Sequence, residues 1–296
     1  MNASITSNRR PLARALFTFL IAIAALGATP PNARAKVYVT QFSIVSEYDA
    51  TTGGVIKASF IMGLNLPVAL ALSGNTLLVA SAFDTVSEYD AKTGDAINGT
   101  FITGLNGGLN GPTGLAVEGN TLYVANLGAN PGTGFVGKYD AVTGGVINAR
   151  FIMGLNLPVA LALSGNTLFV ASATDTVGKY DAKTGAPIAA TFIEGLNGPV
   201  GLAVKGNTLF VASNSRGTVS AYNATTGTPI NRSFIAGLNG PVGLAVKGNT
   251  LFVANSPPFA GESTVGAYDS KTGAPINVNF ITGLTGLGGI AVKSAK

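Results

Sequence analysis

The chain contains no cysteine and no histidine, and only 10% of its 296 residues are charged. Without cysteine it can form no disulfide, offer no catalytic thiol and carry no acylated lipoprotein anchor. Without histidine it lacks the commonest general base and the commonest metal ligand. Any polar surface must therefore be built mainly from Asn, Ser, Thr and Gly.

The first 35 residues have the layout of a secretory signal peptide. Arg9, Arg10 and Arg14 form a basic start, residues 15–28 are an apolar run, and Ala33-Arg34-Ala35 is an A-x-A cleavage site. The run is too short to span a bilayer comfortably. The sequence predicts export, to a secreted or periplasmic location. A short anchor that stays attached is the alternative, and the arginine pair leaves the export route open.

Removal of the leader changes the charge of the chain. The whole sequence has 18 basic and 13 acidic residues, and four of the basic ones precede Lys36, so residues 36–296 carry 14 − 13 = +1. A nearly neutral chain gives no electrostatic reason to bind nucleic acid or an anionic membrane. We expect neither as a partner after cleavage.

Residues 36–296 are repetitive almost throughout. The phrase Tyr-Asp/Asn-Ala/Ser-x-Thr-Gly occurs six times, at steps of 41, 50, 41, 42 and 46 residues. Its tyrosines are Tyr48, Tyr89, Tyr139, Tyr180, Tyr222 and Tyr268. Each unit contains four short apolar segments rich in β-branched and aromatic residues, for example 200–204, 208–213, 218–223 and 230–235. This pattern predicts four strands per unit and no helix.

The connectors indicate how the strands pair. Gly-Asn separates the first and second segments at 74–75, 119–120, 165–166, 206–207 and 248–249, which predicts tight hairpins. An Asp-Ala-Lys-Thr-Gly turn or a close variant separates the third and fourth. The fourth segment often begins after a proline, which suits an outer edge strand because proline cannot donate to a ladder.

The two chain ends contain complementary halves of one unit. There are five Gly-Asn hairpins but six tyrosine units, and the sixth hairpin is missing where the ends would meet. We therefore expect strand 288–292 to pair with strand 36–40. The predicted fold is all-β: a six-bladed β-propeller of four-stranded antiparallel blades over residues 36–296, closed by that pairing. A four-stranded solenoid is the alternative.

The repeat "PVGLAVKGNTLFVASNSRGTVSAYNATTG" (199–227) resembles NHL-type and YVTN-type propeller repeats, and the resemblance covers essentially all of 36–296. The tryptophan of WD repeats is absent. The six-blade count is similar to that of the gluconolactonase and strictosidine-synthase-like families, although none of their local motifs is present. The resemblance implies a propeller fold and leaves the activity open, since such propellers include binding platforms, lyases, lactonases and synthases.

Comparison of the six units indicates where a ligand could bind. All length variation falls on one face, in 126–135, 255–264 and the doubled "GLNGGLNG" at 104–111; repeat-specific insertions often mark a binding face. The polar position of the "GLN" phrase could also ring the mouth of the central channel. Its members are Asn65, Asn106, Asn156, Asn197, Asn239 and Thr285. Drift in unconstrained loops, and a simple turn role for asparagine, are the alternatives.

The carboxylates divide into structural and candidate functional groups. The repeated turn positions are predicted to be structural: Asp49, Asp90, Asp140, Asp181, Asn223 and Asp269. Glu47 and Glu88 share a strand position with lysine and alanine, which suggests a solvated outer face. The remaining charged candidates on the variable face are Asp84, Asp175, Glu194 and Glu262, with Arg216 as the cation.

These residues favour a monomeric, non-catalytic binding scaffold for a protein or a small polar ligand such as a carbohydrate. The alternatives are a metal-assisted hydrolase or lactonase of the same fold, and a structural or surface-attached repeat protein. No catalytic residue is predicted, and whether the chain is an enzyme stays open. No cofactor is expected except possible calcium, which would have to use Asp84, Asp175 or Glu194 with the asparagine ring.

Overall fold

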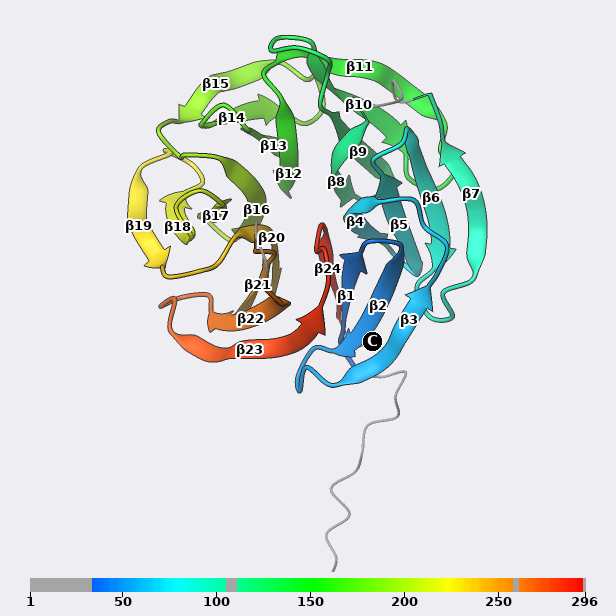
Figure 1. The fold of residues 1–296 in the computed structure, drawn as a ribbon. Helices are drawn as coiled ribbons and strands as arrows, with labels where there is room; N and C mark the ends of the chain where they lie inside the picture. Colours follow the sequence, from blue (N-terminus) through cyan, green and yellow to red (C-terminus); the bar gives the residue numbers. More distant parts are fainter. Residues whose placement is uncertain (1–33, 105–110, 258–260, 295–296) are drawn as a thin grey trace, which may run out of the picture.

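The computed structural model describes residues 34–104, 111–257 and 261–294, which form 24 strands in six four-stranded antiparallel sheets arranged in a ring (Figure 1). The prediction of six blades is confirmed. Blade 1 is β24(Ile290–Lys293), β1(Lys36–Gln41), β2(Ile44–Asp49) and β3(Val55–Ile61); blade 2 is β4(Pro67–Ser73), β5(Thr76–Ser81), β6(Thr85–Asp90) and β7(Ala96–Ile102); blade 3 is β8(Pro112–Glu118), β9(Thr121–Asn126), β10(Gly134–Asp140) and β11(Val146–Leu155). Blade 4 is β12(Pro158–Ser164), β13(Thr167–Ser172), β14(Thr176–Asp181) and β15(Pro187–Ile193); blade 5 is β16(Pro199–Lys205), β17(Thr208–Ser213), β18(Thr218–Asn223) and β19(Pro229–Ile235); blade 6 is β20(Pro241–Lys247), β21(Thr250–Asn255), β22(Ser263–Asp269) and β23(Pro275–Leu284).

Blade 1 is completed from both ends of the chain, as predicted. Strand β24 pairs antiparallel with β1, with Val37 opposite Val292 and Val39 opposite Ile290, and Figure 1 shows the red strand β24 beside the blue strand β1. The observed strand begins at Ile290 rather than at residue 288. The Thr40 hydroxyl accepts the backbone N–H of Gly289 at 2.6 Å, and the backbone N–H of Thr40 donates to the carbonyl of Gly289 at 3.0 Å, so the contact with the blade starts one residue before the regular strand.

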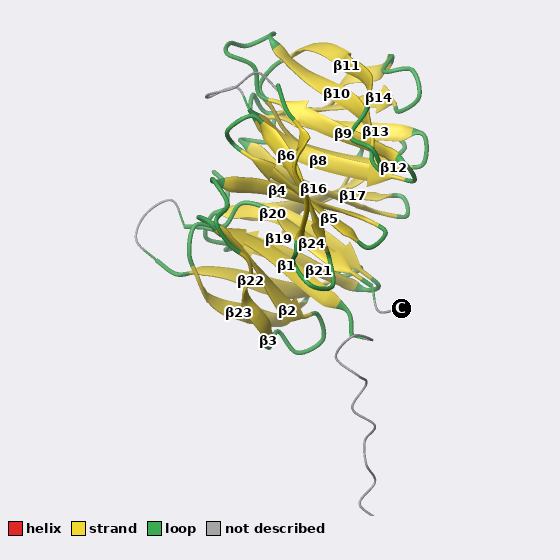
Figure 2. Ribbon diagram, turned by 90° about the vertical axis from the view of Figure 1, so that its right-hand side faces the viewer, coloured by secondary structure: helices red, strands yellow, loops and turns green. Residues whose placement is uncertain are grey.

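The two faces of the ring differ in their connectors (Figure 2). The turn face, on the right in Figure 2, carries the Gly-Asn hairpins and the aspartate turns. In the five hairpins only the glycine has a positive φ, between 52° and 57°, the pattern of a type II′ turn. The loop face, on the left, carries the connectors between the second and third strands and those between blades.

The innermost strands lie against one another around the axis, which requires a small residue at one position in each. A Cβ on Gly289 would lie 2.8 Å from the Cα of Ala69, and one on Gly114 would lie 3.1 Å from the Cα of Ala160. The six residues at this position are Ala69, Gly114, Ala160, Gly201, Gly243 and Gly289. The small, apolar first segment of each repeat is therefore explained by backbone contact between neighbouring blades.

The hydrophobic core consists of six clusters, one at each interface between blades. The interface that closes the ring is typical: Val37, Tyr48 and Ile290 of blade 1 pack against Phe252 and Val265 of blade 6. Because each cluster is shared by two blades, no blade buries its apolar residues alone. The stability of the ring therefore depends on every interface, including the closing one.

The glycine of each aspartate turn docks on the preceding blade. Gly53 has a φ of +75°, and a Cβ there would lie 1.9 Å from the carbonyl oxygen of Phe280 in blade 6. Gly94 meets Phe60 of blade 1 in the same way, at 2.3 Å. The repeated Thr-Gly therefore satisfies a left-handed backbone and a close approach between blades at once.

The prediction that Glu47 lies on a solvated face is wrong. Its side chain is only 3% exposed, and its carboxylate lies 2.5 Å from the Nζ of Lys36, which is 9% exposed. The position faces the neighbouring blade rather than solvent, because a middle strand of a propeller blade is covered on both sides. Glu88 at the same position in blade 2 is half-buried, and burial raises the pKa of its carboxyl.

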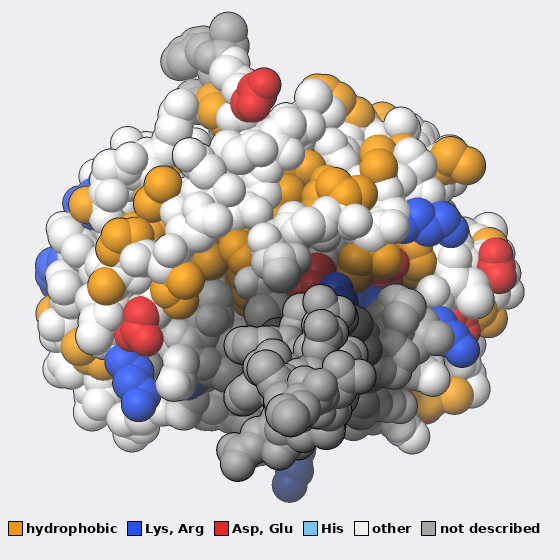
Figure 3. Space-filling model, turned by 90° about the horizontal axis from the view of Figure 1, so that it is seen from below, with side chains coloured by type: hydrophobic (Ala, Val, Ile, Leu, Met, Phe, Trp, Pro, Cys, Tyr) orange, Lys and Arg blue, Asp and Glu red, His pale blue; other side chains and the backbone are white. Residues whose placement is uncertain are grey.

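No helix in the described part of the chain is long and apolar enough to cross a membrane. The outer surface is mostly uncharged: Figure 3 shows hydrophobic side chains dispersed among polar ones, with charged groups few and separated. The predicted signal peptide is outside the described residues, apart from Arg34 and Ala35, so its cleavage stays a prediction.

Candidate functional site

Each turn aspartate, and Asn223 in its place in blade 5, is hydrogen-bonded within its own turn. In each turn the first carboxylate or amide oxygen accepts the backbone N–H groups two and three residues on; for Asp90 these distances are 2.7 and 2.9 Å. The other turns repeat the arrangement at Asp49, Asp140, Asp181, Asn223 and Asp269. These groups are engaged by their own turns on the turn face.

These contacts lower the pKa of the turn carboxyls. Backbone N–H donors are the largest cause at Asp90, Asp140, Asp181 and Asp269. At Asp49 burial acts in the opposite direction, but the N–H groups of Thr51 and Thr52 and the cation of Arg34 outweigh it. The repeat tyrosines are shifted in the opposite direction, because burial raises the pKa of their phenols. These tyrosines are Tyr48, Tyr89, Tyr139, Tyr180 and Tyr268.

A plateau of stability across neutral pH follows from these shifts. A carboxyl with a lowered pKa in the folded state stabilises the fold above its ordinary value of 3.8 and loses that effect as the pH falls. A phenol with a raised pKa destabilises the fold once the unfolded chain ionises above its ordinary value of 10.0. With no histidine, we expect a melting temperature that is flat from about pH 6 to about pH 9 and falls on both sides. Calorimetry across the pH range checks this, and a step near pH 6 to 7 would contradict it.

The channel at the ring axis is narrow, and backbone groups and small or aliphatic side chains line it. Its cavity has a volume of about 110 Å³ and is lined by the innermost strands, with residues such as Val68, Leu115, Val200 and Ile290. The residues that line it include no charged side chain and none of the described "GLN" asparagines. A cavity of about 110 Å³ is too small for a sugar.

The "GLN" positions lie on the loop face, in the connectors that precede the innermost strands. The described members, Asn65, Asn156, Asn197, Asn239 and Thr285, are all exposed; Asn106 lies outside the described residues. Thr285 donates its backbone N–H to Gln41 at 3.2 Å. When the amide oxygen of Asn197 faces Arg216, the guanidinium donates to it at 2.9 and 3.1 Å. The ring of asparagines thus occurs as an exposed set, and its proposed ligand role stays a prediction.

The acidic candidates do not converge. Asp84 lies in blade 2 and Asp175 in blade 4, with blade 3 between them. Asp175 accepts the backbone N–H of Gly198 at 2.9 Å and so holds the connector to blade 5. Glu194 is exposed on that connector. Among the described residues, no three Asp or Glu side chains lie close enough together to hold a metal ion.

Both aspartates take a left-handed backbone, with φ of 78° at Asp84 and 76° at Asp175. The matching residue in blade 5 is Gly217, with φ of 61°. Aspartate tolerates this conformation better than most residues. The matching positions of the two aspartates are thus explained by turn geometry.

The loop face has a feature that the sequence analysis missed: an exposed apolar patch over blades 1 and 2. Phe42 is 62% exposed, Met62 71%, Leu66 44% and Phe83 47%. Backbone hydrogen bonds make the segments that carry them adjacent, from Leu64 to Ser43 at 2.9 Å and from Ala82 to Leu66 at 3.0 Å. We call these four residues the apolar patch. Among the described turns of the opposite face, only Val142 is a comparably exposed large apolar residue.

Leu66 also has an unfavourable backbone conformation. Its φ is 45°, and Leu157 at the same place in the repeat has a φ of 47°. Gly198, Gly240 and Gly286 occupy this position in other connectors, with φ between 59° and 68°. A leucine in the left-handed region costs about 1–2 kcal/mol relative to glycine. The chain therefore holds an exposed leucine where a glycine would relieve strain.

The repeats did contain a signal for this patch. The position of Phe83 holds Thr174 in blade 4, so comparison of these two copies singles out this aromatic residue, whereas the position of Met62 holds Thr103 in blade 2 but Met153 in blade 3. The signal is one apolar side chain, Phe83, at a turn position that is polar in blade 4.

The fold defines a closed six-bladed β-propeller. A family model described as outer membrane protein assembly factor BamB, of the PQQ_2 propeller-repeat type, matches residues 132–228, about a third of the chain. No curated protein matches the chain.

Two solved structures show the same kind of fold. A chain of a nidogen/laminin complex is 13% identical, with a TM-score of 0.68 over 88% of this chain and 99% of that one. The computationally designed Ika8 protein is 18% identical, with a TM-score of 0.51 over 84% and 71%. At these identities the similarity concerns the fold alone.

Proposed function

We propose that the protein is an exported, non-catalytic binding scaffold whose loop face docks a partner polypeptide on the apolar patch. The observation that carries the proposal is Leu66, an exposed leucine kept in a left-handed conformation that glycine takes in other repeats. Strain that is retained at an exposed apolar position indicates a role beyond the fold.

The charge of the loop face favours a basic partner. Asp84, Asp175, Glu194 and Glu262 lie on this face, against Arg216, which gives 1 − 4 = −3 among these residues. A polypeptide with apolar and basic side chains would match both the patch and this charge. The leader sequence and the family match to an outer membrane assembly factor support export; the NHL or YVTN type of the repeats stays a prediction.

Site-specific photocrosslinking tests the proposal and identifies the partner. A benzoylphenylalanine at position 83 is expected to give a crosslinked polypeptide in the native source, while the same residue at position 142 on the turn face gives none. Equal crosslinking from both faces, or none from position 83, would argue against the patch.

Two substitutions then test the patch against the captured partner. Phe83→Thr copies the turn of blade 4, and Leu66→Gly copies the connectors of blades 5 and 6. Each is expected to weaken binding about tenfold, as for truncation of an interface anchor. Neither should lower the melting temperature, because relief of strain at position 66 offsets the backbone entropy of glycine. Leu157→Gly is the matched control; binding lost equally in the control would refute the role of the patch.

A further inference from the structure

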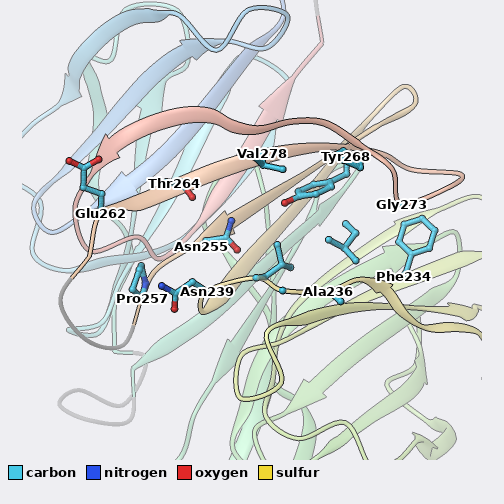
Figure 4. A pocket seen from close by; sticks show the side chains of 14 residues that line it. Phe234, Ala236, Asn239, Asn255, Pro257, Glu262, Thr264, Tyr268, Gly273 and Val278 are labelled. Carbon is cyan, nitrogen blue, oxygen red and sulfur yellow. The ribbon is translucent and has the colours of Figure 1, made fainter.

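A cleft between blades 5 and 6 has features of a small-molecule site. It has a volume of about 650 Å³, and the exit of β19 and the outer strands of blade 6 line it. Figure 4 shows Asn255 at its centre, with Asn239 and Pro257 on one side and Tyr268 on the other. This volume is in the range of ligand pockets.

Two side chains that line the cleft are smaller than their counterparts in some other units. Thr264 lines the cleft at a position that holds Phe135, only 5% exposed, in blade 3 and threonine in blades 2, 4 and 5. Ala236 lines it where Met62 and Met153 stand in other units. Pro257 and Glu262, which are described residues between β21 and β22, are both lining residues. The small side chains of Thr264 and Ala236 therefore leave room at this interface.

Asn255 supplies an unused hydrogen-bond acceptor. Its side chain lines the cleft, the residue is 6% exposed, and its Nδ2 donates to the carbonyl of Val253 at 3.3 Å. Its Oδ1 is shielded from solvent and has no partner among the described residues. Buried polar atoms in proteins are nearly always paired, so an unpaired acceptor at a cleft indicates a missing donor.

The other lining groups define the chemistry of that donor. Tyr268 is 5% exposed, and its hydroxyl points toward Asn255 and Thr264 (Figure 4). Phe234 and Pro257 add apolar surfaces, and no Lys or Arg is among the lining residues. Amide and hydroxyl groups beside an aromatic and a proline ring suit a ligand with hydroxyl donors on one edge and C–H groups on another. Without a cation, an anionic ligand is disfavoured.

We infer that this cleft binds an uncharged polyhydroxylated ligand, a sugar residue, through Asn255, Thr264 and Tyr268. This site is distinct from the apolar patch of blades 1 and 2, and it does not depend on the proposed partner.

Saturation-transfer NMR with glucose, galactose and N-acetylglucosamine, and with the amine glucosamine as a charged comparison, each at millimolar concentration, tests the inference. At least one sugar is expected to bind the wild-type protein. Asn255→Ser introduces the residue that blades 4 and 5 hold at this position, as Ser172 and Ser213, and should weaken binding about tenfold or more. Thr264→Phe, which copies blade 3, should abolish binding by filling the cleft.

Asn126→Ser is the matched control. Asn126 also has a buried Oδ1 without a partner among the described residues, but in blade 3 the large side chain of Phe135 takes the place of Thr264. The control should bind sugar as the wild type does, and circular dichroism checks that all three variants keep the fold.

The inference fails if no neutral sugar binds, or if Asn255→Ser binds as tightly as the wild type. It also fails if only the amine glucosamine binds and Glu262→Gln removes that binding, since the ligand would then be a cation. Phe83→Thr should leave sugar binding unchanged. A failed sugar test together with a partner crosslinked at position 83 would leave the proposed function standing.

Discussion

A chain that ends at Leu287, and therefore lacks β24, is expected to lose cooperative folding. The truncation removes Ile290 and Ala291, each 8% exposed, from the inner edge of blade 1. It also leaves β1 with an unpaired edge, exposing Val37 and Val39, which are otherwise fully buried. Each apolar side chain buried there contributes about 1.5–3 kcal/mol, and a domain's net stability is about 5–15 kcal/mol.

The loss extends beyond the deleted residues because the cores lie between blades. The cluster at the closing interface joins blade 6 to blade 1, so removing Ile290 and opening β1 weakens both. An open sheet edge with buried-type side chains is also a site of aggregation. We expect the truncated protein to be unfolded or aggregated rather than a less stable monomer.

Size-exclusion chromatography and thermal melts of the leader-free protein measure this result. A chain that ends at Lys293 is the control, because β24 ends there and its ladder is intact. A monomer of the shorter chain that melts cooperatively near the full-length temperature would mean that the ring does not need its closing strand.

The closure itself could be predicted from the sequence, and the reason is the count of repeated turns. The Gly-Asn pairs and the Tyr-Asp phrases have fixed roles within a blade, so a shortage of one hairpin located the joint between the termini. Turn chemistry is local, and Asp90 or Gly94 adopts its conformation from its immediate neighbours. Such positions can be assigned without knowledge of the rest of the fold.

The environment of the middle strands could not be predicted in the same way. Alternation along a strand separates core from solvent only when one face of the sheet is exposed. In a propeller both faces of a middle strand meet neighbouring blades, so the sequence pattern predicts solvent exposure at Glu47 although its side chain is buried. Its partner, Lys36, is the residue that follows the predicted cleavage site, and the pair forms within the blade that the two termini complete.

The two candidate binding surfaces depend on comparisons that a single repeat does not offer. The strain at Leu66 follows from a left-handed turn that leucine itself does not signal. The glycines at the same position in other connectors, Gly198, Gly240 and Gly286, reveal it. The cleft beside Asn255 exists because neighbouring side chains are small, and a missing side chain leaves no motif. The residues that the six repeats share therefore predict the fold, whereas the candidate sites lie where the repeats differ.

Lys36→Thr is expected to lower the free energy of unfolding by about 3–5 kcal/mol, because it leaves the Glu47 carboxylate buried without its cation. The propeller fold does not require an ion pair at these two positions. Blades 5 and 6 carry Thr208 with Ala221, and Thr250 with Ala267, at the same two positions. The double variant Lys36→Thr/Glu47→Ala copies these blades and should recover most of the lost stability.

Urea unfolding of the wild type, both single variants and the double variant gives the coupling between the two positions. Lys92→Thr, at an exposed turn, is the control and should change the free energy by no more than about 0.5 kcal/mol. A double variant as unstable as Lys36→Thr would show that the chain loses packing rather than an ion pair. Recovery in the double variant would show that the stability of the fold does not require the ion pair. Blade 1 would then differ from blades 5 and 6 in carrying this pair beside the predicted cleavage site.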